Sequence, residues 1–260
     1  MIGFLIKKCF FDMWDNMFKI GALNLGFLAS LSFPLLLPFA LPNILSLKII
    51  ITVIGVLWCF VYLAASALSL KRISDYSNFS FLDLLTNFAA AVPCGSVACV
   101  IFFIIIALLR FVIPFYILMG NWAGLLIASF VFWFFLMIPP ALQFIFAAYA
   151  RLNGNIAKKI KKCFIIFFDN SFFCVCVMLI CIIFFAISSL TMFLFPGPVG
   201  IVLFLDEALR LRLLKYDWLE SNPCVKNHKG LKIPWDELLE EERENTGSRT
   251  IRNFIFPWKD

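Results

Sequence analysis

Few residues in the apolar part of this 260-residue sequence could bind a polar group or carry charge. Asp206 and Arg210 lie four positions apart, a spacing that places both side chains on one face of a helix and makes an ion pair available. Gln143, three residues after Pro140, is the one uncharged amide deep inside an apolar run. An acid at membrane depth is costly unless it is paired or faces water. We therefore treat Gln143, Asp206 and Arg210 as a candidate intramembrane polar site.

Simpler interpretations compete with such a site. The charged residues at the end of the last apolar run could lie at the cytoplasmic headgroup level with their side chains reaching water; they are Asp206, Glu207, Arg210 and Arg212. We favour this interpretation for the charges. Gln143 could bind a substrate, or it could hydrogen-bond to a neighbouring helix and hold two spans together.

The sequence offers no convincing catalytic or metal-binding set. Cys174, Cys176 and Cys181 lie in one apolar run, where cysteine packs as a small hydrophobic residue, and no further polar ligand is nearby. Cys224 and His228 form a lone Cys-x3-His pair, which is too few ligands for a zinc site. No nucleophile stands beside a base. We expect no enzyme activity, no catalytic residue, no metal, no cofactor and no disulfide.

The composition indicates an integral membrane protein in contact with the lipid bilayer. Of its residues 63% are hydrophobic and 15% are charged, and the mean hydropathy is +0.96. Soluble domains are about 45–50% apolar and about 25% charged. A soluble core of this size could not hide the surplus, so a soluble enzyme and a nucleic-acid-binding domain are excluded.

The apolar runs predict six transmembrane helices, because a helix of about 20 apolar residues crosses a bilayer. They lie at about 20–41, 49–70, 88–109, 122–150 and 171–195, followed by a shorter amphipathic run at 198–215. Basic residues gather on one side of these spans, at 7–8, 71–72, 151–162 and 210–215, whereas the other side carries only Lys48 and Arg110. Positive charge marks the cytoplasmic side, so we predict that both termini are cytoplasmic.

An internal repeat suggests three helical hairpins, at about 10–72, 81–151 and 164–212. Lys7-Lys8-Cys9-Phe10 recurs 154 residues later as Lys161-Lys162-Cys163-Phe164, and Asp15-Asn16 and Pro42 recur at the same offset. A looser middle copy, FLDLLTN, ends at Asn87. Each copy predicts an amphipathic segment at the cytoplasmic interface. In the first and last copies, the lysines of this segment would face the headgroups. Asn16, Asn87 and Asn170 would then cap the helix that follows.

The composition divides the chain into a membrane domain at 1–215 and a cytoplasmic tail at 216–260. In the tail, Pro234 opens a predicted helix whose first turn is acidic and which ends near Gly247. Trp235, Phe254 and Trp258 give this tail large apolar side chains that could dock on a partner or lie back on the membrane.

The chain resembles the YesL-like family of small bacterial integral membrane proteins, whose biochemical function is unknown. The resemblance rests on FFDMWDNMFKIGALNLGFLASLSFPLLLP, on ALSLKRISDYSNFSFLDLLTNF and on IAKKIKKCFIIFFDNSFF, and it covers about residues 5–215. Genes of that family often lie near carbohydrate ABC transporter genes. The resemblance therefore implies an accessory role in sugar uptake at the bacterial cytoplasmic (inner) membrane. It supplies no catalytic residues, and the tail lies outside it.

Two functions remain open. The first is a non-enzymatic accessory or interaction subunit of a membrane complex, with a transporter permease as the suspected partner. The chain has no phosphate-binding P-loop motif, so a partner would have to supply any coupling to ATP. The alternative is a stand-alone transporter of a lipid or small solute. The scarcity of polar residues in the spans disfavours a polar solute but not a lipid.

Overall fold

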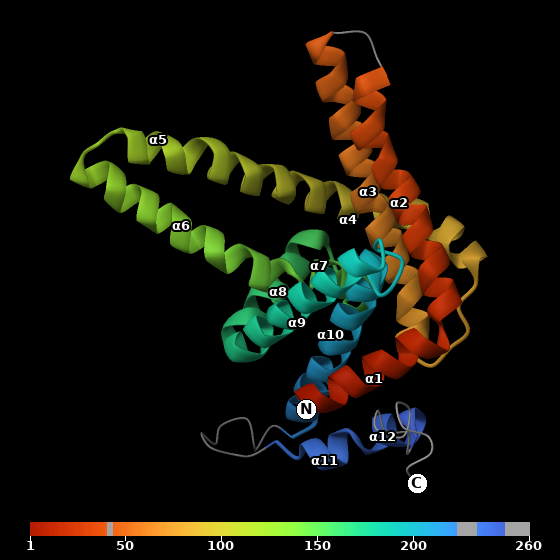
Figure 1. The fold of residues 1–260 in the computed structure, drawn as a ribbon. Helices are drawn as coiled ribbons and strands as arrows, with labels where there is room; N and C mark the ends of the chain where they lie inside the picture. Colours follow the sequence, from red (N-terminus) through yellow and green to blue (C-terminus); the bar gives the residue numbers. More distant parts are fainter. Residues whose placement is uncertain (41–43, 223–232, 248–260) are drawn as a thin grey trace.

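The computed structural model describes residues 1–40, 44–222 and 233–247, and within these ranges every regular element is helical. The helices are α1 (Ile2–Asp15), α2 (Met17–Ala40), α3 (Leu45–Ser74), α4 (Phe81–Ala107), a π-helical turn η1 (Leu108–Val112), α5 (Ile113–Leu118), α6 (Trp122–Leu142), α7 (Ile145–Arg151), α8 (Ile156–Asp169), α9 (Ser171–Leu190), α10 (Gly197–Ser221), α11 (Trp235–Leu238) and α12 (Glu240–Thr246). Figure 1 shows α2–α3 and α4–α6 as two long hairpins that diverge from a common base.

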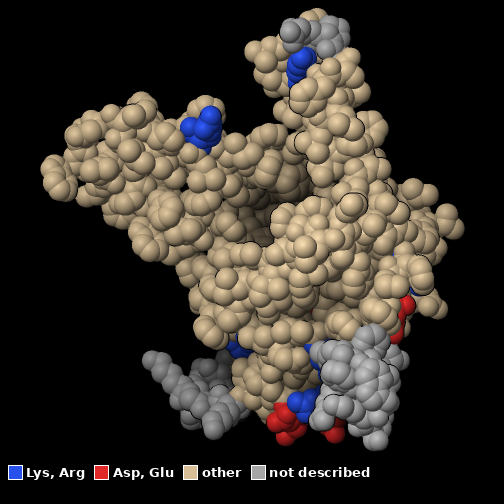
Figure 2. All heavy atoms as spheres, in the orientation of Figure 1, with Lys and Arg blue, Asp and Glu red and all other residues tan. Residues whose placement is uncertain are grey.

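Five helical segments are long and apolar enough to cross a membrane. They are Met17–Ala40, Leu45–Ser74, Phe81–Leu118, Trp122–Arg151 and Ser171–Leu190, which correspond to the first five predicted spans. Their outer ends carry large exposed apolar side chains, such as Trp122 and Phe39. Exposed apolar surface of this extent indicates contact with lipid rather than water. Figure 2 shows the charged side chains gathered at the opposite end of the molecule, apart from isolated basic side chains on the outer ends of the hairpins.

The sixth predicted span, 198–215, lies within α10, which is not among these five segments. The four charged residues between 206 and 212 lower its hydropathy. Most of the first half of α10 is instead buried inside the protein, against α3, α9 and α2. Its charges are therefore surrounded by protein groups rather than by lipid.

The base of the molecule is built around α3, whose buried face includes many small residues, among them Ala64, Ala65 and Ala67. Small side chains let helix backbones approach closely in a membrane protein. Helices α4 and α3 also approach closely at a small residue, Gly95. A methyl group added at Gly95 would lie 2.6 Å from the Cα atom of Val61. These close crossings hold α3 in the centre of the helical base.

The repeated sequence forms matching helices at its first and last copies. Helices α1 and α8 both have 14 residues, and they begin and end 154 residues apart. Asn16 and Asn170 follow them, and each side-chain amide donates to the carbonyl oxygen four residues earlier, at Asp12 (3.1 Å) and Ile166 (3.3 Å). Asn170 does occupy the N-cap position of α9, as predicted, but its side chain forms no cap bond there. Both amides bond instead to the last turn of the preceding helix.

The middle copy differs from the other two. Asn87 lies inside the uninterrupted helix α4, and its amide donates to the Ser69 hydroxyl on α3 (3.1 Å). The helix begins six residues earlier, where Ser80 and Asp83 form a reciprocal capping box. The interpretation of Asn87 as a turn into the membrane is therefore wrong.

A buried asparagine on α2 fixes the connection between α9 and α10. The Asn24 amide donates to the carbonyl oxygens of Leu194 (3.0 Å) and Pro196 (2.7 Å), and its oxygen accepts from the Val199 backbone N–H (3.0 Å). Gly197 packs against it with a positive φ of 64°, and a Cβ atom there would lie 2.4 Å from the amide. Asn24 thus satisfies buried backbone groups at Pro196 and Val199, where α10 begins.

We expect Asn24→Ala to lower the free energy of unfolding by about 2–3 kcal/mol, because it leaves buried backbone groups without partners. Asn87→Ala is the matched control, since that amide makes a single side-chain bond, and it should cost about 1 kcal/mol. Denaturant unfolding of both variants in detergent micelles measures the difference. Equal losses would contradict the role given to Asn24.

Candidate functional site

The charged end of the molecule, which we call the basic face, carries Lys7, Arg72, Arg151 and Arg210 and contains a buried ionic network. At its centre Asp206 on α10 has no exposed surface. Arg151, the last residue of α7, binds it with two parallel hydrogen bonds, from Nε to Oδ1 (2.8 Å) and from Nη2 to Oδ2 (2.5 Å). Two-pronged pairing of this kind is the strongest arrangement for arginine and a carboxylate.

The predicted ion pair between Asp206 and Arg210 is not formed. Arg210 instead binds Asp75, just after α3 (2.9 Å), and Glu242 on α12 (2.7 Å), and it donates to the Ser74 carbonyl oxygen. Asp75 also receives a bond from Arg151 (3.0 Å), so the two arginines share one carboxylate. Asp206 and Arg210 do lie on one helix, as their spacing predicts. Each of them binds residues from other parts of the chain instead of the other.

The favoured interpretation that these charges lie at the headgroup level is wrong for the two acids. The side chains of Asp206 and Glu207 are completely buried where α10 packs against α1, α3 and α7. The two arginines keep partial exposure, and 21% of the side-chain surface of Arg210 is accessible. The acids are thus internal groups of the protein and do not reach the headgroups.

Helix α1 contributes a lysine that the sequence analysis had assigned to the headgroups. Lys8 is fully buried, binds Asp12 (2.6 Å) and the Ser74 carbonyl oxygen (3.4 Å), and lies over the Tyr76 ring at 4.3 Å. Burial alone would lower the pKa of Lys8, but the attraction of Glu207 and Asp12 outweighs it and raises this pKa above its ordinary value. Lys8 therefore stays protonated inside the protein.

Glu207 lies close to Lys8 and Asp12, and both of its carboxyl oxygens are buried without a hydrogen-bond donor among the described residues. Burial disfavours the charged form of this acid, and the positive charge of Lys8 opposes that effect. This is a second buried acid that sequence spacing did not single out. The signal that could have found the α1 side of the cluster is the four-residue spacing of Lys8 and Asp12 on the helix face that also carries Leu5 and Cys9.

The tail is tied to this network through α12. Glu242, with 5% of its side chain exposed, accepts a hydrogen bond from the Tyr76 hydroxyl (2.9 Å) besides its ion pair with Arg210. Lys7 on α1 donates to the Gly247 carbonyl oxygen (3.3 Å), and Leu239, between α11 and α12, is buried. Trp235, predicted as a docking residue, lies 5.5 Å from the Arg212 guanidinium, whereas Phe254, Trp258, Cys224 and His228 lie outside the described residues.

Gln143 does not join this network. Its amide donates to the carbonyl oxygens of Pro140 (3.0 Å) and Cys174 (2.9 Å), so it links α6 to α9. A carbonyl oxygen has two lone pairs, so that of Cys174 can accept this bond in addition to the bond within α9. Gln143 thus joins two helices, and the candidate site Gln143, Asp206 and Arg210 is not one site.

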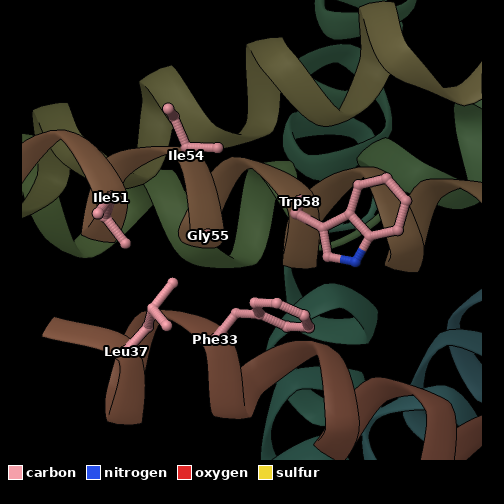
Figure 3. A pocket seen from close by; sticks show the side chains of 6 residues that line it. All are labelled: Phe33, Leu37, Ile51, Ile54, Gly55 and Trp58. Carbon is pink, nitrogen blue, oxygen red and sulfur yellow. The ribbon is translucent and has the colours of Figure 1, made fainter. Parts of the chain in front are cut away.

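The pockets within the membrane-spanning part are apolar. One of about 420 Å³ lies between α2 and α3, lined by Phe33, Leu37, Ile51, Ile54, Gly55 and Trp58, with the Trp58 ring facing Phe33 (Figure 3). Another, of about 350 Å³, lies where α3, α4, α6 and α10 meet and includes Gln143. Figure 2 shows the surface hollowed between the two long hairpins. These linings suit hydrocarbon and offer little to a polar solute.

We expect Asp206→Ala to destabilise the protein by about 3–5 kcal/mol, because it leaves the buried Arg151 without its main counter-charge. Asp236→Ala removes a carboxylate from the exposed pair with Arg243 and should cost less than about 1 kcal/mol. Unfolding of the two variants in the same detergent gives the comparison. A loss at Asp206 no larger than that at Asp236 would refute the central place of the network.

Comparison with known proteins gives no relative from which a role could be transferred. No family model, no curated protein and no solved structure matches the chain. The resemblance to the YesL-like family therefore stays a prediction, and the contacts of the basic face are the basis for a functional proposal.

Proposed function

We propose that this chain is a non-enzymatic polytopic membrane protein that acts as an accessory or interaction subunit of a membrane complex. The observation that carries the proposal is the attachment of α12 to the buried network through Glu242. An ion pair shielded from water positions the tail far more firmly than surface contacts would. The tail then presents a fixed surface on the basic face, which suits a protein that holds a partner in place.

The contacts of the basic face also support the proposed topology. The bond from Lys7 to Gly247 joins α1 to the tail, so both ends of the described chain lie on one side of the membrane domain. That side carries most of the lysine and arginine residues near the spans. By the positive-inside rule we infer that it is the cytoplasmic side, with both termini in the cytoplasm. The bacterial inner membrane is taken from the resemblance to the YesL-like family.

In this proposal α9 and α10 form the third hairpin. The turn between them binds Asn24, seven residues or about 10 Å along α2 from Met17. Helix α10 then returns to the basic face, where Asp206 and Arg210 meet α3 and the tail. The third hairpin would therefore enter and leave on the same side without reaching as far as α2–α3, which fits six helices arranged as three hairpins.

The kind of partner is taken from the resemblance. A YesL-like protein implies the permease of a carbohydrate ABC importer, and the partner would supply the ATPase. The apolar pockets favour the alternative of a transporter only for a lipid or another apolar solute, because their linings could accommodate hydrocarbon chains.

The proposal predicts a partner that is lost when the tail is displaced. We expect a stoichiometric membrane complex to co-purify with the tagged protein from native membranes in mild detergent and to be absent when the chain is cut after Asn222. Glu242→Arg opposes Arg210 and should reduce recovery at least about tenfold. Glu244→Arg, the same charge change at an exposed position of α12, should retain the complex. Mass spectrometry of the eluates measures recovery.

Recovery of the protein alone from wild-type membranes would overturn the accessory role. Reconstitution into liposomes and measurement of labelled-lipid movement would then test the transporter alternative. Unfolding curves of Glu242→Arg and Glu244→Arg show whether either substitution acts by unfolding the membrane domain. A complex that persists in Glu242→Arg and in the truncated chain would assign the partner to another surface.

A further inference from the structure

A pocket of about 480 Å³ lies on the basic face, apart from the ionic network. It is bounded by the junction of α8 and α9, by α10, by Trp235 at the start of α11 and by Met1 and Ile2 at the start of α1. Arg212 on α10 contributes the one cationic side chain of this lining, and Ser171 and Phe172 contribute the first turn of α9.

Arg212 differs from the other arginines of α10 and α7. Its guanidinium group lies 3.9 Å from the centre of the Phe173 ring and 5.5 Å from that of Trp235. Its Nε–H is buried with no acceptor, and the guanidinium forms no hydrogen bond or ion pair with any residue in the part of the chain that the structure describes. Arg151 and Arg210, by contrast, each bind two carboxylates. A half-buried cation with unused donors favours an anionic ligand.

The neighbouring acid does not supply that anion. The Asp169 carboxylate accepts hydrogen bonds from Lys215 (2.7 Å), from the Tyr216 hydroxyl (2.7 Å) and from the Asn170 amide (2.9 Å). Partial burial would raise the pKa of Asp169, but the bonds from Lys215 and Tyr216 lower it below its ordinary value. Asp169 therefore forms its ion pair with Lys215, and it attracts Arg212 without hydrogen-bonding to it.

Two further features indicate which kind of ligand the pocket could bind. It includes the start of the 20-residue helix α9, whose first backbone N–H groups receive no side-chain cap from Asn170. Such N–H groups favour negative charge. Phe172, beside them, is 80% exposed and begins a segment long and apolar enough to cross the membrane. The pocket therefore lies where lipid-facing surface meets the basic face, at the depth of phospholipid headgroups.

We propose that this pocket binds the phosphate group of an anionic phospholipid headgroup, with Arg212 as its principal ligand and the acyl chains lying along Phe172. The guanidinium group donates from its edge to phosphate oxygens while its faces remain stacked on Phe173 and Trp235. The inference does not depend on the proposed partner, because its ligand belongs to the bilayer.

Native mass spectrometry of the full chain in detergent, titrated with phosphatidylglycerol or phosphatidylcholine, tests the assignment. We expect phosphatidylglycerol to bind with clear preference and Arg212→Gln to weaken its binding at least tenfold. Arg72→Gln removes an exposed arginine from the same face, one that binds Asp83, and should leave binding unchanged. Arg212→Lys keeps the charge but loses the planar donor fork, so it should give an intermediate affinity.

A competition with inorganic phosphate distinguishes a phospholipid headgroup from a free phosphate ion as the ligand. Displacement of phosphatidylglycerol by inorganic phosphate at equal concentration would assign the pocket to a free anion and overturn the lipid proposal. Equal binding of the two lipids, or unchanged binding in Arg212→Gln, would also overturn it. If Arg212→Gln does not fold, the same comparison is made with Arg212→Lys, for which unchanged lipid preference and affinity would contradict the proposal.

Discussion

The burial of Asp206 is the constraint on which the rest of the base depends. A carboxylate without exposed surface needs a partner with matching geometry, and Arg151 supplies it from the end of α7. Because Arg151 also binds Asp75, the ends of α3 and α7 are fixed relative to α10 by one guanidinium group. Lys8 then brings α1 to the same place through the Ser74 carbonyl oxygen. Breaking such a buried pair is more costly than losing many surface pairs.

The network explains why α10 can carry so many charges beside membrane-spanning helices. Its acids are neutralised or shielded by groups from α1, α3 and α7, so lipid never has to solvate them. The two long hairpins need no such support, since their surfaces are almost wholly apolar and can face hydrocarbon directly. The molecule therefore combines an ionic base with apolar arms, and the base is where another protein or a headgroup can be recognised.

Sequence reasoning predicted the features that depend on local pattern. Long apolar runs were sufficient for five spans, and the repeat at 154 residues anticipated two helices with equal bounds. Partners from distant helices were out of reach: nothing near Asp206 points to Arg151, which lies 55 residues away. Lys8 was misplaced because lysines beside a span usually face headgroups. Asn24 was missed although a lone asparagine within an apolar run is itself a signal of an internal polar contact.

The hydrogen bond from Lys7 to Gly247 joins residues 240 positions apart, and this separation has a consequence for synthesis. Ribosomes add roughly 5–20 residues per second, so the first helix is made on the order of 10 to 50 seconds before its partner in the tail. Helix α10, which carries Asp206 and Glu207, is also translated long after α1 and shortly before the tail. The contacts that join α1 to α10 and to the tail can therefore form only after both long hairpins have been translated.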